Sequence, residues 1–253
     1  MGTIAILKFP KRTFLITKLI KARKFLKQHN NVKTVLEKTG GFSGELRTQK
    51  TNHLAGIKTK ETTYFENNCT FKFNVDETYF SPRLSEERKK TAEEISKLTK
   101  KNKTNILIMF SGISPYPIIL AKKLKEAKKE AKIYSNELNK KANGYAEKNI
   151  QLNKLTKKIE LVSGDAEKLP NKISKKMEII LMTRPNLKKT FLKTALKLSK
   201  KGTTIFYHGF GTKDEIIKEI KKETPNKIGK ITIRKAGNIG KYKFRWLAKF
   251  KVI

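Results

Sequence analysis

The decapeptide at residues 79–88 reads YFSPRLSEER and concentrates groups that can move protons and stabilise charge. Ser81 as N-cap and Pro82 at the first helical position predict a helix that begins here. A carboxylate on such a helix can accept a proton from a substrate, and a guanidinium can stabilise negative charge that develops on it. The side chains of these types are Arg83, Glu87 and Arg88. Ordinary pairing of Glu and Arg on a helix surface is the alternative.

A candidate cofactor site follows about twenty residues later, where the apolar run NILIMF at 105–110 leads into SGISP. In a doubly wound sheet the first strand-to-helix turn must let a cofactor approach backbone amides, which small residues permit. The small residues here are Ser111, Gly112 and Ser114, directly after Phe110. Alone, this turn is weak evidence for a cofactor.

Two carboxylates stand where the next two strands are predicted to end. Glu137 closes the strand KIYSNEL, where an acidic side chain can accept both hydroxyls of a ribose. Asp165 follows LVSG, where it could accept the exocyclic amine of an adenine. Each carboxylate singly is explained as well by a helix N-cap or a solvated charge. Their joint spacing favours a nucleoside-bearing cofactor, and without a GxxxxGK or GxGxxG motif S-adenosylmethionine fits better than ATP or NAD.

Two further segments are candidates for contact with a planar base. The fourth strand is predicted to end at MTRPN, residues 182–186, where amino-methyltransferases hold a base beside the cofactor. Pro185 equally indicates a plain turn. In GELRT, Arg47 follows a glycine-rich turn, and a lone exposed cation is the ordinary explanation.

The order of predicted elements divides the chain in two. Residues 1–80 predict a small α+β domain, with strands at 4–9, 32–36, 61–65 and 70–75 and a helix at 13–28. Residues 81–253 predict an α/β fold with a doubly wound, mostly parallel sheet, because apolar strands alternate with lysine-rich helices. The strands are expected near 105–110, 131–135, 158–163, 177–183, 202–208, 228–234 and 243–252. The helices are expected near 82–100, 116–128, 139–152, 187–199 and 213–223.

Composition limits the class of partner and the compartment. Lys and Arg total 59 against 22 acidic residues, a formal net charge of +37, so nucleic acid is the expected partner. Most of these cations are Lys, so the few arginines are the more informative ones. One cysteine, Cys69, excludes an internal disulfide, and three scattered histidines show no metal-ligand spacing, so no metal is expected. No apolar stretch could span a bilayer and no signal peptide is evident, so we expect a cytoplasmic protein.

Taken together, the motifs resemble the archaeal and eukaryotic tRNA (guanine-N1)-methyltransferases that modify position 37, beside the anticodon. The resemblance runs through IAILKFP, NVKTVLEKTGGFSGELRT, ENNCTFKFNVDETYFSPRLSEER, MFSGISP, SGDAEKLP and IRKAGNIGKYKFRW. Its most specific parts are GGFSGELR and YFSPRLSEER. The aminocarboxypropyl transferases of wybutosine synthesis are close relatives, but they usually lack Arg-Leu after Ser-Pro. Arg83 and Leu84 therefore favour methyl transfer.

The resemblance implies a class I S-adenosylmethionine-dependent fold preceded by a small RNA-binding domain, acting as a monomer on the tRNA anticodon arm. It implies that Glu87 takes the guanine N1 proton, that Arg47 stabilises charge on O6, and that Tyr79 packs near cofactor and base. The implied cofactor-binding residues are Arg88, Phe110, Gly112, Glu137, Asp165, Ala166 and Thr183. The implied substrate-binding residues are Arg83, Thr183 and Pro185.

This chain departs from the family pattern at three positions in the expected pocket. Ile108 stands in place of Asp, Ser114 in place of Gly, and Thr183 in place of Asn. These changes bear on cofactor affinity and base specificity. The extra amino-terminal domain with which some members grip the tRNA elbow is not expected, so recognition should rest more on the anticodon arm.

Two alternative functions stay open. The chain could methylate the tricyclic wyosine precursor, 4-demethylwyosine, at position 37, alone or alongside guanine. It could also be a tRNA-binding protein whose cofactor site has degenerated, since Ile108 and Ser114 are changes that drift would produce.

Overall fold

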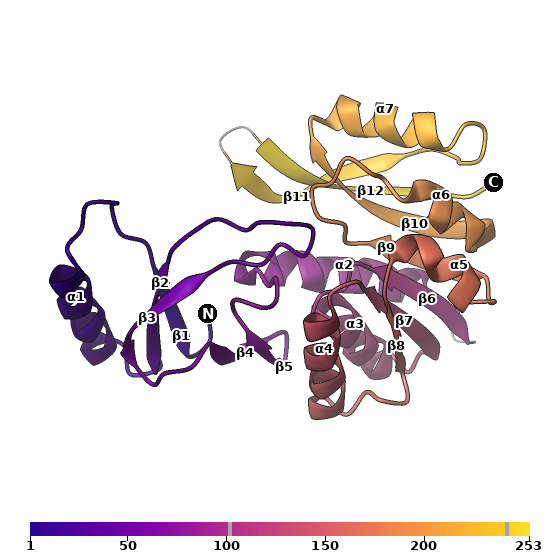
Figure 1. Cartoon of the computed structure of the whole chain (residues 1–253). Coiled ribbons are helices and arrows are strands. Elements are labelled where there is room, and N and C mark those ends of the chain that lie inside the picture. Colours follow the sequence, from indigo (N-terminus) through magenta and orange to yellow (C-terminus); the bar gives the residue numbers. More distant parts are fainter. Residues whose placement is uncertain (101–102, 241–242) are drawn as a thin grey trace.

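The computed structural model describes residues 1–100, 103–240 and 243–253. Its carboxy-terminal part is built on a seven-stranded sheet with the order β11-β12-β10-β9-β6-β7-β8 (Figure 1). The strands are β6 (Thr104–Met109), β7 (Ala131–Glu137), β8 (Ile159–Ser163), β9 (Met177–Met182), β10 (Ser199–Gly211), β11 (Thr232–Gly240) and β12 (Lys243–Lys251). All neighbours from β10 to β8 pair in parallel, and β12 runs antiparallel to both β10 and β11. This confirms the predicted α/β sheet.

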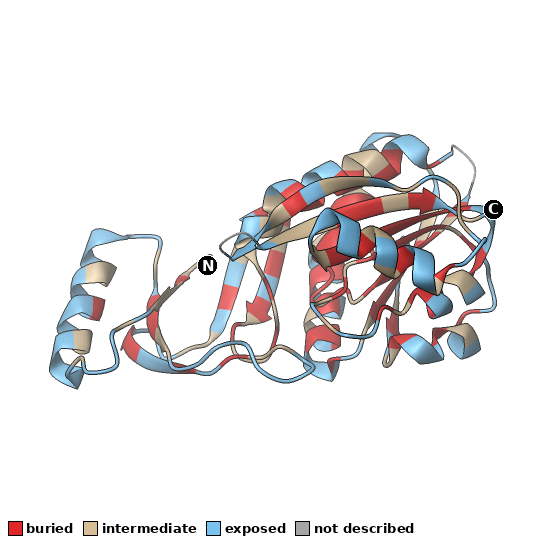
Figure 2. Ribbon diagram, turned by 90° about the horizontal axis from the view of Figure 1, so that it is seen from above, coloured by how far each residue is buried: buried red, intermediate tan, exposed pale blue. Residues whose placement is uncertain are grey.

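Helices cover both faces of this sheet because both faces of its strands are apolar. Along β6, Ile106 and Ile108 join one core cluster and Leu107 and Met109 join the other, as the alternation of side chains in a strand requires. The helices are α2 (Ser85–Leu98), α3 (Pro115–Glu126), α4 (Lys140–Leu152), α5 (Leu169–Lys172), α6 (Leu192–Lys197) and α7 (Lys213–Glu223). Strands β6 and β9 at the centre of the sheet are mostly buried, whereas β11 at its edge has a single buried residue (Figure 2).

A separate three-stranded sheet lies at the amino-terminal end of the molecule (Figure 1). It contains β1 (Ile4–Leu7), β2 (Thr34–Lys38) and β3 (Thr51–Gly56), with β1 parallel and β3 antiparallel to β2. Helix α1 (Leu15–Gln28) packs on it through Ala22. Strand β3 was not predicted from the sequence, because TNHLAG has few residues that favour strands and its conformation is fixed by pairing with β2.

The hairpin of β4 (Glu61–Glu66) and β5 (Cys69–Asn74) joins the two parts. Asn149 lies in α4 (Lys140–Leu152) and Asn153 caps its carboxyl end. Each side-chain amide bonds both the N–H and the C=O of a β5 residue, Lys72 and Thr70 respectively. The two amides thus act as a further strand along the edge of β5. Because the hairpin is fixed to α4, we propose that the domain boundary lies near residue 60 rather than at the predicted residue 80.

Three predictions of secondary structure are corrected in detail. The helix expected over 82–100 begins as a 3₁₀ turn, Pro82–Leu84, and the Ser81 side chain makes no capping hydrogen bond. The helix expected over 187–199 is only α6, because residues 183–191 form a loop that contains Pro185. The strand expected over 228–234 is β11, which starts and ends later.

The described part of the chain contains neither a candidate membrane span nor a candidate metal cluster. None of its helices is both long and apolar enough to cross a bilayer. Nowhere in residues 1–100, 103–240 and 243–253 do three His, Cys, Asp or Glu side chains gather as potential metal ligands.

Candidate active site

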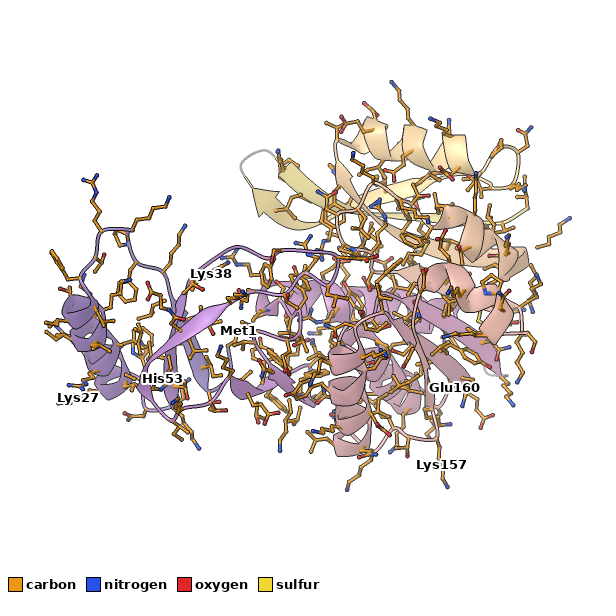
Figure 3. The ribbon with its side chains drawn as sticks, viewed as in Figure 1. Met1, Lys27, Lys38, His53, Lys157 and Glu160 are labelled. Carbon is orange, nitrogen blue, oxygen red and sulfur yellow. The ribbon has the colours of Figure 1, made fainter. Side chains whose placement is uncertain are left out.

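A cavity of about 1140 Å³ opens at the carboxyl ends of the parallel strands, between the two parts of the molecule. The small domain contributes Met1 and Lys38 to its wall, and Figure 3 shows both near the junction with the α/β domain. The cavity also collects every predicted site residue except Glu87: Arg47, Tyr79, Arg83, Arg88, Phe110, Gly112, Glu137, Asp165, Ala166, Thr183 and Pro185. This position is where ligands bind in open α/β sheets.

The turn after β6 has three residues with positive φ. Phe110, Gly112 and Ser114 all have positive φ, at 63°, 57° and 65°. Only glycine adopts this region without strain, so the two other residues are held there by their surroundings. A Cβ at Gly112 would lie 3.5 Å from the carbonyl oxygen of Tyr79, so the turn packs closely on the segment that precedes α2.

Glu137 is fixed at the end of β7 by two backbone amides. Its Oε2 accepts a hydrogen bond from the N–H of Gly112 at 2.8 Å, and its Oε1 accepts one from the N–H of Asn139 at 2.8 Å. Burial raises the pKa of this carboxyl, and the hydrogen bonds from Asn139 and Gly112 oppose that rise. Each oxygen can accept a further hydrogen bond, and Glu137 lines the cavity, which suits the predicted contact with ribose hydroxyls.

The three departures from the family pattern differ in their consequences. Ile108 is fully buried in the core, and the Ser114 hydroxyl bonds that of Ser135 on β7 at 2.8 Å, so neither side chain is part of the cavity wall. Thr183 does line the cavity, but its hydroxyl donates to the carbonyls of Met109 and Phe110, at 3.0 and 2.9 Å. With its proton used there, this hydroxyl can offer a bound base only an acceptor.

Arg47 approaches the cavity from the small domain. Its guanidinium lies 5.2 Å from the centre of the Tyr79 ring, which itself packs edge-on against Phe42. The Arg47 Nε is buried and has no hydrogen-bond partner among the described residues. A cation held in place by an aromatic ring, with an unsatisfied donor in a cavity, can bind a developing negative charge.

Glu87 lies on α2 and is buried but does not line the cavity. Its carboxylate receives two hydrogen bonds from Arg234 of β11, from Nη1 to Oε2 at 2.6 Å and from Nη2 to Oε1 at 3.0 Å. Thr91 donates a further bond to Oε1 at 2.8 Å, and Glu94 accepts from Arg234 Nε at 2.7 Å. Sequence reasoning missed Arg234; the available signal was that it is one of few arginines in a lysine-rich chain.

Comparison with protein families matches residues 62–234 to the TRM5/TYW2 methyltransferase domain. The chain belongs to this family. Its match begins at the β4–β5 hairpin and ends at Arg234, so it takes in both the hairpin and the partner of Glu87.

Two relatives with assigned functions are similar to this chain in sequence. The chain is 33% identical over 211 residues to the tRNA (guanine(37)-N(1))-methyltransferase Trm5b of Pyrococcus abyssi, covering 83% of this chain and 59% of the relative. It is 47% identical over 132 residues to the Nanoarchaeum equitans tRNA (guanine(37)-N(1))/4-demethylwyosine(37)-methyltransferase Taw22, covering 52% of this chain and 41% of the relative. The chain thus spans about half the length of these relatives.

Solved structures of TRM5 proteins share the fold over the whole chain. The crystal structure of Trm5b from Pyrococcus abyssi superposes with a TM-score of 0.80 at 28% identity, covering 99% of this chain and 73% of that one. A complex of aTrm5 with tRNALeu superposes with a TM-score of 0.83 at 25% identity, covering 100% of this chain and 70% of that one. The arrangement of the small sheet, hairpin and α/β domain is therefore common to the TRM5 fold.

Within this TRM5/TYW2 domain, Arg88 has a structural partner that the sequence analysis did not anticipate. It is 2% exposed and bonds the Glu66 carboxylate with two nitrogens, Nε at 2.5 Å and Nη2 at 2.7 Å, and Nη2 also donates to the Ser81 carbonyl at 3.0 Å. Most of its guanidinium is therefore committed to joining α2 to the hairpin. Its predicted contact with the cofactor would have to use the remaining nitrogen or its charge alone.

We expect Arg88→Met to destabilise the fold by about 3–5 kcal/mol, because Glu66 would be left as an uncompensated buried charge. Urea unfolding measures the effect. The double variant Arg88→Met/Glu66→Leu removes both charges and should recover much of the loss. Equal stability of the single and wild-type proteins would show that the pair contributes little.

Proposed function

We propose that this chain binds S-adenosylmethionine in the cavity and transfers its methyl group to N1 of the guanine at position 37 of tRNA. The observation that carries the proposal is that one cavity unites the turn after β6, Glu137 and Asp165 with Arg47 and Tyr79. Family membership and the printed activities of the relatives support it. We further propose a monomer that acts on the anticodon arm in the cytoplasm of an archaeon.

The residues of the cavity fit the cofactor. Phe110 and Gly112 of the turn after β6 line the cavity, and Glu137 offers acceptors to a ribose. Asp165 and Ala166 line the cavity after β8, where we expect the adenine. Asp165 caps the turn that follows β8 through the N–H of Glu167 at 2.9 Å, which fixes its carboxylate at the cavity edge. When bound, S-adenosylmethionine would supply the electrophilic methyl group.

The chain itself must remove a proton and stabilise charge. Guanine N1 carries a proton at neutral pH and is then a poor nucleophile, so a base must accept this proton as the new N1–C bond forms. We propose Glu87 as the final acceptor. The charge left on the base is largest on O6, where the guanidinium of Arg47 can bind it. The cavity also brings the base and cofactor together, which removes much of the entropic barrier.

The test is transfer of labelled methyl from S-adenosylmethionine to unmodified tRNA transcripts that differ only at position 37. We expect about one methyl per molecule with guanine there and none with adenine. If neither transcript is labelled while calorimetry shows tRNA binding without cofactor binding, the chain is a degenerate tRNA-binding protein.

A second candidate substrate is the tricyclic wyosine precursor at the same position. The Nanoarchaeum equitans relative is named for both reactions, and Thr183 alters the base-binding loop. Incubating the chain with tRNA that carries 4-demethylwyosine and analysing its nucleosides would detect this activity. A product only from the guanine transcript would restrict the proposal to guanine.

We expect tRNA affinity to fall steeply with salt, because the net charge of +37 is supplied mainly by lysines that contact phosphates without reading sequence. Between about 50 and 200 mM salt the loss should be on the order of 10³-fold. Filter binding at several salt concentrations measures the slope. A flat response would contradict phosphate-dominated binding.

A further inference from the structure

Arg245 is a cation of the cavity wall that has no charged partner within residues 1–100, 103–240 and 243–253. It lies on β12 and is half-buried. Its Nε is buried without a hydrogen-bond partner among these residues, and its terminal nitrogens form no hydrogen bond or ion pair with them. None of the roles proposed for the cavity residues uses this guanidinium.

Other buried or half-buried arginines of the α/β domain are neutralised. Each of the following is paired with a carboxylate: Arg88 with Glu66, Arg184 with Glu219, and Arg234 with Glu87. Arg83 lines the cavity without an ion pair, but it is exposed, as a solvated cation would be. Withdrawing a cation from water without a partner destabilises a fold, so the half-buried Arg245 is best explained by an anion that binds it.

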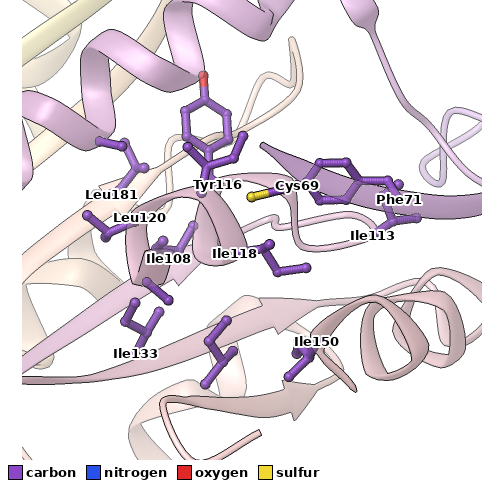
Figure 4. Close-up of a cluster of buried hydrophobic side chains, with 14 of the residues drawn as sticks. Cys69, Phe71, Ile108, Ile113, Tyr116, Ile118, Leu120, Ile133, Ile150 and Leu181 are labelled. Atoms are coloured by element: carbon purple, nitrogen blue, oxygen red, sulfur yellow. The ribbon is translucent and has the colours of Figure 1, made fainter. Parts of the chain in front are cut away.

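Strand pairing and an aromatic ring hold Arg245 in place. It stands opposite Phe210 of β10 and Gly237 of β11, and its guanidinium carbon lies 5.1 Å from the centre of the Phe210 ring. Gly237 has no side chain that could cover the guanidinium. Leu247, two residues further along β12 on the same face, belongs to the apolar core in which Figure 4 shows Tyr116. The core therefore supplies no counter-charge, and the cavity is the side from which an anion can approach.

Charge is unevenly distributed along the described wall of the cavity. Its carboxylates are Glu45, from the small domain, and Glu137 and Asp165, after β7 and β8. The other end of the cavity, over β10 to β12, has no carboxylate in its described wall and carries the cations Lys243 and Arg245. Four strand spacings separate β12 from β7, roughly 19 Å across the sheet. The anion that suits Arg245 therefore lies away from the ribose end of the proposed cofactor.

We propose that Arg245 binds a phosphate of the RNA backbone next to the target purine. This inference rests on the proposed function. Thr183, where the base is expected, follows β9, and only β10 lies between β9 and β12. A phosphodiester flanking that base is an anion at this end of the cavity, and a guanidinium can bind it with two parallel hydrogen bonds.

The contact would act on binding and not on the chemical step. Drawing a base out of its loop costs a few kcal/mol of lost stacking, and fixing the adjacent phosphate offsets part of that cost. The Phe210 ring keeps the guanidinium oriented before RNA arrives, which lowers the entropic cost of forming the contact.

The test uses tRNA assembled by ligation with a single methylphosphonate, which is uncharged, in place of the phosphate on either side of nucleotide 37. Wild-type protein should bind one of these two RNAs about tenfold more weakly than unmodified tRNA, the usual effect of losing a charge-assisted hydrogen bond. Arg245→Met should bind unmodified tRNA about tenfold more weakly, and the same methylphosphonate should then cost it less than about twofold. The salt dependence of its binding should fall by about one unit of slope.

Further measurements separate this contact from other roles of Arg245. The rate at saturating tRNA, the affinity for S-adenosylmethionine and the melting temperature should match the wild type. Arg245→Lys keeps the charge without the planar fork, so its affinity for tRNA should lie between those of the wild type and Arg245→Met. Lys249→Met is the matched control, because Lys249 is a half-buried cation of the same strand outside the cavity wall. It should bind every RNA as the wild type does.

Three results would overturn the phosphate contact. One is a methylphosphonate effect of equal size in the wild type and Arg245→Met. Another is weaker binding of S-adenosylmethionine by Arg245→Met, which would assign Arg245 to the carboxylate of the cofactor. The third is a slower reaction with normal tRNA affinity, which would assign it to the base. A wild-type protein that binds these RNAs without methylating them would overturn the proposed function alone, since the contact is judged from binding. A wild-type protein that binds none of them would overturn both.

Discussion

Replacing Glu87 with glutamine should lower the single-turnover rate of methyl transfer by about 10²–10⁴, because the amide cannot accept the N1 proton. Binding of tRNA should be unchanged, since Glu87 is buried behind the residues that line the cavity. Rapid-quench measurements with saturating S-adenosylmethionine give the rate, and filter binding gives the affinity. The combination of a slow reaction and normal binding is the expected signature of a lost proton acceptor.

Glu86 provides a control for this experiment because it is the adjacent carboxylate on the same helix and is exposed. Glu86→Gln should react at the wild-type rate. The fold of the Glu87 variant should persist, because Arg234 keeps its bond to Glu94 at 2.7 Å. If Glu87→Gln reacts as fast as wild type, Glu87 is a structural partner of Arg234 and another group takes the proton.

Replacing Arg47 with alanine should lower the rate by about 10²–10³, the usual cost of removing one donor from a developing oxyanion. Alanine keeps a Cβ at this position of positive φ, so the backbone strain at 50° is the same in both proteins. Arg47→Lys retains the charge but loses the planar guanidinium that lies over the Tyr79 ring. Its rate should therefore lie between those of the wild type and Arg47→Ala. Single-turnover kinetics on one tRNA transcript separate the three proteins.

Lys50 is the matched cation for Arg47, since it is exposed on the same segment and outside the cavity wall. Lys50→Ala should keep the rate and weaken tRNA binding only slightly. If Arg47→Ala and Lys50→Ala behave alike, Arg47 contributes general positive charge and has no specific contact with the base.

The parts of the fold that could be predicted are those marked by a pattern of neighbouring residues in the sequence. The apolar run before SGISP gave β6 and its turn, and the spacing of Glu137 and Asp165 placed both at strand ends on one cavity. The strand β3 was missed because its conformation depends on β2, not on its own residues. Non-local pairing of this kind leaves little trace in a single sequence.

Non-local pairing also explains why two ion pairs at the site were not predicted. Arg234 and Glu87 are 147 residues apart, and the partners Arg88 and Glu66 lie in different domains of the predicted division. With 59 basic residues against 22 acidic ones, each carboxylate has many candidate partners, so no pattern identified which side chains would pair.

The most direct test of the account is nucleoside mass spectrometry of a tRNA transcript with guanine at position 37, after one turnover with S-adenosylmethionine. The account predicts one 1-methylguanosine per tRNA, located at position 37. Methylation of another nucleoside, or of another atom of that guanine, would contradict it.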